Sequence, residues 1–355
     1  MMVYIIIFLI TIVLCGFEAN MKYITIGGNK VAIKQISFWI IYIYLLILGI
    51  CRNEFLGADS SSYKIYYWDV YKNLDFVSAI HHDNDFGFGT VCWIISRFTD
   101  DYWIFRAVIY GVSFTIISIW IYKYSKNISV SFLLFLGFGH LKFDFTILRQ
   151  VIAVSIFIWG FKFIIERKLL KYIIVIALAA CFHKTVLFMI MLYPFGDKRI
   201  KNERAIVKII CLLGAIGIVV AGGSLITIFY QRQDYSGYLV KGEGYNLLLF
   251  YIILFLVLKL FVNRILQNDI LKTELNLMVP NICIQIVATT FSLFTRMLFY
   301  TTPFTFILVP DILEELDVET RKTMVLILGV MLTLLFYVTY RNADIVPYIT
   351  HWYRK

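Results

Sequence analysis

Long apolar runs, separated by short polar segments, follow one another along almost the whole chain. A helix needs about 20 apolar residues to cross a bilayer, or somewhat fewer where flanking side chains reach the interface. Ten runs meet this requirement, and each predicts one membrane-spanning helix. They cover residues 3–17, 36–51, 103–122, 128–141, 147–166, 205–222, 244–262, 276–294, 297–313 and 323–340.

A further apolar stretch, residues 172–196, is interrupted in its middle by Phe182, His183 and Lys184. Basic residues flank it on both sides: Arg167, Lys168 and Lys171 before it, and Lys198, Arg199, Lys201 and Arg204 after it. Cytoplasmic loops are enriched in Lys and Arg, so both clusters are expected inside. This favours a hairpin of two half-length helices with His183 and Lys184 at its tip. A single tilted span is the alternative, and it would place one basic cluster outside.

The same rule orients the rest of the chain as one integral membrane domain, residues 1–355. Lys22, Lys30, Lys34, Lys123 and Lys126 all fall in loops that are expected to be cytoplasmic. Two polar segments, residues 52–102 and 223–243, then lie outside. Within the first, the apolar residues 86–98 are too few to span and suit a short helix in the interface.

Composition agrees with this all-α, polytopic membrane bundle. Of the 355 residues, 61% are hydrophobic and only 16% are charged, whereas a soluble domain averages about 45–50% apolar and about 25% charged residues. This excludes a soluble enzyme and a nucleic-acid-binding protein, and the net charge of +10 fits basic cytoplasmic loops. The six cysteines lie singly, without the spacing of a zinc site or a disulfide framework. We therefore expect no metal and no cofactor.

Charged residues next to the external ends of the spans indicate a candidate site. Arg52 ends the second span, Arg149 and Gln150 begin the fifth, and Arg296 interrupts the apolar stretch 278–309. An ionisable group near the bilayer is costly and usually faces a cavity or a partner. With His183 and Lys184 these residues fall on one side of the membrane, beside the external residues Asp59, Tyr63, Tyr66 and Asp85.

Each of these residues also has a simpler interpretation. Arg52 could extend from a span end to the interface, Arg296 could mark a turn between two spans, and His183 could be a packed core histidine. Together they predict a positively lined external cavity. Arginine presents a planar fork that matches phosphate oxygens, and a lipid-linked pyrophosphate lies at this depth. The chain has no Walker loop and no GxGxxG motif to hold a nucleotide.

An ordered series of short motifs resembles the EpsG family of Wzy-like O-antigen, capsule and exopolysaccharide polymerases. The segment from Arg52 through Gly57-Ala58-Asp59 to Tyr63 and Tyr66 is similar to the family's R…GxDxxxY pattern. The other matching motifs are Asp85-Phe86-Gly87-Phe88, Leu148–Ala153, Phe182-His183-Lys184, Arg296-Met297 and Pro347-Tyr348. Two positions depart from the family: Glu-x-Gly-Tyr is common where this chain has Asp85-Phe86-Gly87-Phe88, and a small residue often stands at Lys184.

The resemblance implies a GT-C-like glycosyltransferase, without metal or cofactor, in the bacterial inner (cytoplasmic) membrane. It would join oligosaccharide repeat units linked to undecaprenyl pyrophosphate at the outer face, with lipid-linked donor and acceptor. A chain-length regulator and a flippase would be partners, besides membrane lipids and without nucleic acid. The alternatives are a lipid-linked glycan ligase and, in a different class, a lipid-linked oligosaccharide flippase or transporter.

The resemblance also implies roles for the candidate residues. Asp59 is the first choice for the catalytic base, His183 the second and Asp85 the third, because a base must be a carboxylate or imidazole near the acceptor hydroxyl. The residues expected to bind the pyrophosphate or the sugars are Arg52, Arg149, Arg296, Lys184, Gln150, Tyr63 and Tyr66.

Overall fold

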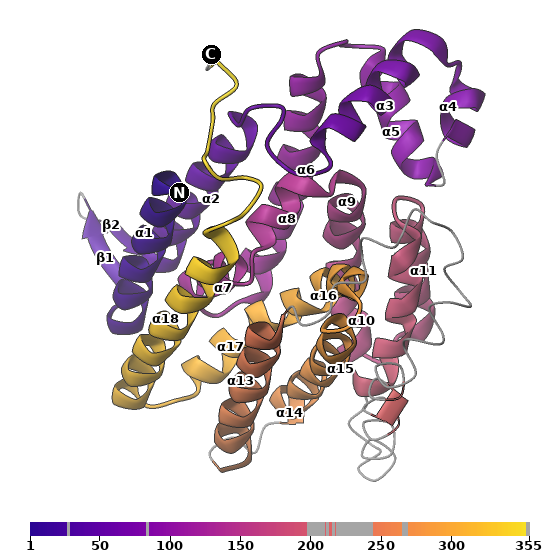
Figure 1. Ribbon diagram of the computed structural model, residues 1–355. Helices are drawn as coiled ribbons and strands as arrows, with labels where there is room; N and C mark the ends of the chain where they lie inside the picture. The colour runs from indigo at the N-terminus through magenta and orange to yellow at the C-terminus, as the bar shows by residue number, and fades with distance from the viewer. Residues whose placement is uncertain are drawn as a thin grey trace.

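Helices form almost all the regular structure of the chain in the computed structural model (Figure 1). The structure describes residues 1–26, 29–82, 85–196, 244–264 and 269–352, together with residues 210, 213, 214 and 217. Within these ranges, seven helical segments are long and apolar enough to cross a membrane, and a bent pair of helices makes up to eight. The chain is therefore an all-α membrane bundle. The predicted span at 205–222 lies largely outside the described residues.

The first half of the chain consists of α1 (Met2–Asn20), a hairpin of β1 (Tyr23–Ile26) and β2 (Asn29–Ala32), α2 (Ile33–Ile50), α3 (Ser60–Asn73), α4 (Phe76–His82), α5 (Phe86–Ser96), α6 (Tyr102–Tyr124), α7 (Ile128–Gly137), α8 (His140–Thr146), α9 (Leu148–Phe157), η1 (Ile158–Gly160) and α10 (Phe161–Ile165). The second half consists of α11 (Leu169–Ala180), η2 (Lys184–Gly196), α13 (Tyr245–Arg264), α14 (Asp269–Asn276), α15 (Met278–Ala288), η4 (Ser292–Phe294), α16 (Thr295–Thr301), η5 (Thr302–Phe304), α17 (Thr305–Glu314) and α18 (Val318–Tyr340). The two strands pair antiparallel, with Tyr23 opposite Ala32.

Polar capping residues fix where several of the apolar helices begin. The side chains of Asp101, Asn127 and Asp317 accept hydrogen bonds from the backbone N–H of Trp103, Val130 and Thr320. Such a cap satisfies a backbone donor that the first helical turn leaves without a partner, and contributes about 1 kcal/mol. The starts of α6 and α7 therefore agree closely with the predicted spans at 103–122 and 128–141, whereas α18 begins at Val318, before the predicted span at 323–340.

Two predicted spans differ in the structure. The span at 128–141 is bent by 60° between α7 and α8, where Gly139 adopts a left-handed backbone with φ of 77°, a conformation that costs glycine little. The span at 276–294 contains a shorter helix than expected, because α15 ends at Ala288. The run from Ser292 to Glu314 then continues through η4, α16, η5 and α17 as a separate apolar segment.

The interrupted stretch at 172–196 forms the predicted hairpin. α11 and η2 run antiparallel: the Tyr172 hydroxyl donates to the Met189 carbonyl, and the Arg167 guanidinium donates to the Tyr193 carbonyl at the open end. His183 lies in the turn between the two helices, and Lys184 is the first residue of η2. The two ends of this hairpin therefore lie on the same side of the bundle.

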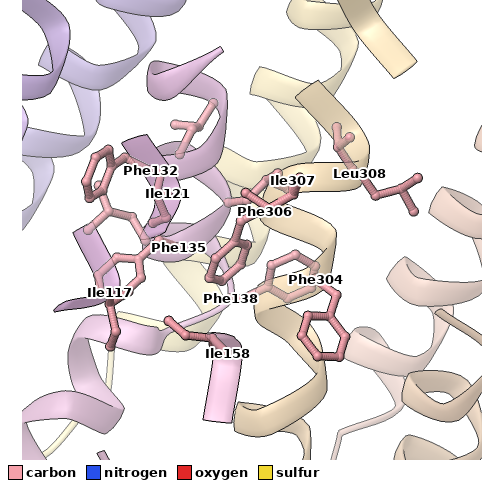
Figure 2. Packing of buried hydrophobic residues seen from close by; sticks show 14 of the residues in the cluster. Ile117, Ile121, Phe132, Phe135, Phe138, Ile158, Phe304, Phe306, Ile307 and Leu308 are labelled. Atoms are coloured by element: carbon pink, nitrogen blue, oxygen red, sulfur yellow. The ribbon is translucent and has the colours of Figure 1, made fainter. Parts of the chain in front are cut away.

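Aromatic and aliphatic side chains from α6, α7, η1, η5 and α17 fill the centre of the bundle (Figure 2). The ring of Phe306 lies 6.1 Å from that of Phe135 and 6.4 Å from that of Phe138, measured between centroids. A hydrogen bond of 2.6 Å from the Ser131 hydroxyl to the Phe306 carbonyl also joins α7 to α17. Polar contacts of this kind, together with close packing, hold helices together in a bilayer.

The basic loops predicted to be cytoplasmic meet at one end of the bundle. Lys34 donates to the Ser125 carbonyl at 2.7 Å, and Lys126 forms an ion pair with Glu315 at 2.7 Å. At the other end, α3, α4 and α5 form a small helical layer above α6 and α9 (Figure 1). This layer carries four of the candidate site residues, Asp59, Tyr63, Tyr66 and Asp85, within or directly before α3 and α5.

Candidate functional site

The C-terminal segment holds the loop that carries Asp59. Backbone hydrogen bonds join the N–H of Asn53 to the carbonyl of Ile349 at 2.7 Å, and the N–H of His351 to the carbonyl of Cys51 at 2.9 Å. The tail thus pairs with residues 51–53, although almost the whole chain lies between the two segments.

Gly57 and Asp344 fix the next turn of this loop. Gly57 has φ of 110°, and a Cβ there would lie 2.5 Å from the Phe145 carbonyl oxygen, so glycine is required by both conformation and space. The Asp344 carboxylate accepts a hydrogen bond of 2.5 Å from the backbone N–H of Ala58. Asp59 is therefore held in place at the start of α3.

Asp59 faces Arg296. Its Oδ2 lies 3.9 Å from Nη2 of Arg296, and the two side chains are 36% and 31% exposed. The backbone of Arg296 is held in place, because the Gln150 side-chain amide donates a hydrogen bond to the Arg296 carbonyl at 2.6 Å. The site therefore has a carboxylate and a guanidinium that a ligand can reach, on α3 and α16.

Arg149 lies against three aromatic rings. Its guanidinium carbon is 5.5 Å from the ring centroid of Tyr63, 5.4 Å from that of Tyr66 and 5.1 Å from that of Phe88. A guanidinium is attracted to ring faces at these distances. Burial raises the pKa of Tyr63, and the positive charge of Arg149 opposes that rise. Arg149 thus joins α9 to α3 and α5 in the external layer.

Asp85 and His183 form a second acid–imidazole contact. Asp85 Oδ2 lies 3.3 Å from His183 Nδ1, and the two side chains are 8% and 20% exposed. The backbone next to Asp85 supports this contact: Gly87 N–H donates to the Cys181 carbonyl at 2.8 Å, and a Cβ on Gly87 would lie 2.8 Å from that same oxygen. The Asp-x-Gly spacing therefore lets α5 begin directly against the hairpin turn.

Contacts between α16 and the hairpin close a ring. The Thr185 hydroxyl lies 3.2 Å from that of Tyr300, one helical turn after Arg296, so the two α16 residues share a face. We call the resulting set the ring site. It consists of Asp59, Tyr63, Tyr66, Asp85, Arg149, Gln150, His183 and Arg296, from α3, α5, α9, α16 and the hairpin turn.

Arg52 lies apart from the ring site. Its side chain is 0% exposed, and its guanidinium carbon is 4.0 Å from the ring centroid of Phe145 and 5.7 Å from that of Tyr110. Burial lowers the pKa of Arg52 to about 10. Sequence analysis grouped Arg52 with the other external cations, whereas the structure places it beneath the loop that carries Asp59. Lys184 is exposed at the start of η2.

Sequence reasoning missed residues that support this loop. Asp344 accepts from the Thr146 hydroxyl at 3.1 Å and lies 3.8 Å from Lys142 Nζ. Nothing in a single sequence connects Asp344 to Ala58. Arg106 is different: it is a buried charge inside the apolar helix α6 and donates to the Arg52 carbonyl, so a charge within an apolar run was the signal that could have found it.

The ring site has the groups that acid–base chemistry on an anionic ligand requires. A reachable carboxylate can accept a proton, and two guanidinium groups can neutralise negative charge. In the described part of the chain, no three His, Cys, Asp or Glu side chains gather within reach of one metal ion.

Comparison with known proteins gives one match. The family model of the EpsG family matches residues 36–350, a range that contains every residue of the ring site. No curated protein and no solved structure matches the chain.

Proposed function

Because the chain belongs to the EpsG family, we propose that it polymerises oligosaccharide repeat units carried on undecaprenyl pyrophosphate. Family membership supports a polysaccharide-polymerase-like role in general. The observation that carries the finer proposal is the Asp59–Arg296 pair beside Arg149, because it combines a proton acceptor with cations at one reachable place.

The proposed reaction is a glycosyl transfer between two lipid-linked glycans. The acceptor hydroxyl oxygen forms a bond to the anomeric carbon of the donor, and the bond from that carbon to the pyrophosphate oxygen breaks. The hydroxyl proton goes to the base, and undecaprenyl pyrophosphate leaves with the electron pair. The leaving group already carries negative charge, so cations rather than an acid stabilise its departure.

Arg296 and Arg149 are the proposed ligands of the pyrophosphate, with Lys184 at its edge, while the buried Gln150 holds the backbone of Arg296 in place. In the structure Arg296 pairs with Asp59. A pyrophosphate would compete for Arg296 and release Asp59, which is then available to accept the proton of the acceptor hydroxyl. His183 and Asp85 are the second and third choices for the base. Tyr66 is the proposed aromatic face for a sugar ring, while the buried Tyr63 packs against Arg149.

The proposed location is the outer face of the bacterial cytoplasmic membrane. The basic residues Lys34 and Lys126 lie at one end of the bundle with their contacts, and Lys-rich ends are usually cytoplasmic. The ring site lies among elements at the opposite end. An all-helical bundle with a charged site of this kind is compatible with a metal-independent GT-C-type enzyme. A flippase that supplies the units and a regulator of chain length are the proposed partners.

Substitution of Arg149 and Asp59 tests this function in cells. We expect Arg149→Ala and Asp59→Asn to lower polymer formation by about 100-fold or more, while lipid-linked single units accumulate and the protein stays in the membrane. Arg97→Ala is the matched control, because Arg97 also lies in the external layer but stacks on Trp93 outside the ring site. An unchanged polymer ladder in both ring-site variants would contradict the proposal.

A further inference from the structure

A mostly apolar groove lies between α13 and α18, close to the ring site. It has a volume of about 360 Å³ and is also lined by α8 and α16, which lie close to the two long helices (Figure 1). Its apolar walls include Leu247 and Tyr251 of α13, Leu298 and Phe299 of α16, and Leu335 and Val338 of α18.

The break between α7 and α8 shapes this groove. Gly139, with φ of 77°, turns the chain by a sharp bend, and a Cβ there would lie 2.7 Å from the Thr339 side chain of α18. The groove opens on the outward surface of the bundle, since Val338 is 43% exposed. The same outward surfaces of α13 and α18 carry the exposed side chains of Leu249 and Leu334, as expected of helices that face lipid.

One end of the groove lies close to the ring site. Thr295, which lines it, directly precedes Arg296. Thr146 also lines it and donates to the carboxylate oxygen of Asp344 that accepts the Ala58 N–H, next to Asp59. Lys142, another lining residue, is 40% exposed. A mostly apolar groove open to the bilayer thus lies next to the part of α16 that carries Arg296 and to residues that hold the loop of Asp59.

We propose that this groove holds the polyprenyl tail of the donor, and that the tail passes Lys142 to reach a pyrophosphate held by Arg296 and Arg149. The inference rests on the proposed function. It adds that the lipid tail in the groove belongs to the donor and not to the acceptor. In the donor, the reacting anomeric carbon is bonded directly to the pyrophosphate, so its tail must start next to the catalytic groups. In the acceptor, the reacting hydroxyl lies at the far end of the glycan from its own lipid. The tail beside Asp59 and Arg296 is therefore the tail of the donor.

Bulky substitutions in the groove test this assignment with purified protein and a short-chain acceptor. We expect Leu247→Trp and Val338→Trp to raise KM for an undecaprenyl-linked donor about tenfold, and to leave KM for a geranyl-linked donor unchanged. Leu249→Trp and Leu334→Trp are the matched controls, because these residues lie on the same two helices and face lipid outside the groove. Equal KM values for groove and control variants would overturn the assignment.

Photolabelling provides a readout that does not depend on turnover. A diazirine-bearing undecaprenyl pyrophosphate should label residues 244–251 and 335–339, and excess phosphatidylglycerol should not displace it. Labelling confined to other segments, or displacement by ordinary phospholipid, would overturn the assignment. Wild-type protein that is labelled in the groove and yet joins no glycan would refute the proposed function and leave a polyprenyl pyrophosphate site.

Discussion

Asp85 shows how a single side chain connects two parts of the site. Its carboxylate is nearly buried, with His183 Nδ1 at 3.3 Å. A buried carboxylate is costly unless it is paired or hydrogen-bonded. Loss of the contact would leave the Asp85 carboxylate buried without a partner, so the contact is favoured. It also orients the His183 imidazole within the ring site. Aspartate achieves this because Gly87 brings the start of α5 up to the Cys181 carbonyl.

The first prediction concerns Asp85 itself. Asp85→Ala should lower polymer formation at least about tenfold, because His183 loses the group that orients it. Asp85→Glu keeps the negative charge, so it should retain most of the activity. Polymer length and amount on a gel provide the measurement. Wild-type polymer in the Ala variant would show that the pair has no role.

Residue patterns predicted much of the ring site and little of its support. Tyr63 and Tyr66 lie three apart on one helix face, and both contact Arg149 as such spacing allows. Arg52 was grouped with the external cations, but it is covered by Phe145. The position of a residue at the end of a span indicates its depth in the membrane. It does not indicate which neighbouring residues cover its side chain.

At the scale of elements, the contact between α5 and the hairpin turn decides whether the ring site closes. Gly87 approaches the Cys181 carbonyl with no room for a methyl group. The apolar pattern gave the positions of α1, α2 and α6 closely, because uninterrupted runs make uninterrupted helices. It did not predict the bend at Gly139 or the end of α15 at Ala288, because hydrophobicity reports burial in lipid and not the backbone turn.

The second prediction concerns this contact. Gly87→Ala should lower the free energy of unfolding by about 1–3 kcal/mol, and should lower activity as well, because the hairpin turn moves away from Asp85. Gly111→Ala in α6 is the control, since its Cβ would meet nothing closer than 3.9 Å. Thermal unfolding in detergent and polymer yield measure the two effects. Equal behaviour of the two variants would show that the close approach has no importance.

At the scale of the whole molecule, the hairpin and the pairing of the C-terminal tail with the loop after α2 determine which elements meet. The tail binds the loop at residues 51–53, and α11 with η2 returns the chain to the end where it started. The hairpin followed from the basic clusters on both sides of an interrupted run. The pairing of Asp344 with Ala58 could not follow from one sequence, because 286 positions separate the two residues.

The third prediction concerns sidedness. In a background without native cysteines, Lys184→Cys should react with a maleimide that cannot cross the cytoplasmic membrane. The reagent is added to cells in which it can reach the outer face of that membrane. Lys168→Cys and Lys198→Cys should react only after that membrane is opened, because both ends of the hairpin are expected inside. Labelling of positions 168 and 198 from opposite sides would show that the stretch crosses the membrane once.

The central claim is that this chain alone joins lipid-linked repeat units. The most direct test is incubation of the purified wild-type protein with undecaprenyl-pyrophosphate-linked units and no other protein. We predict lipid-linked dimers and longer glycans, with one free undecaprenyl pyrophosphate released for each bond formed, and neither product with Asp59→Asn. Units that remain single in the presence of folded wild-type protein would contradict the account.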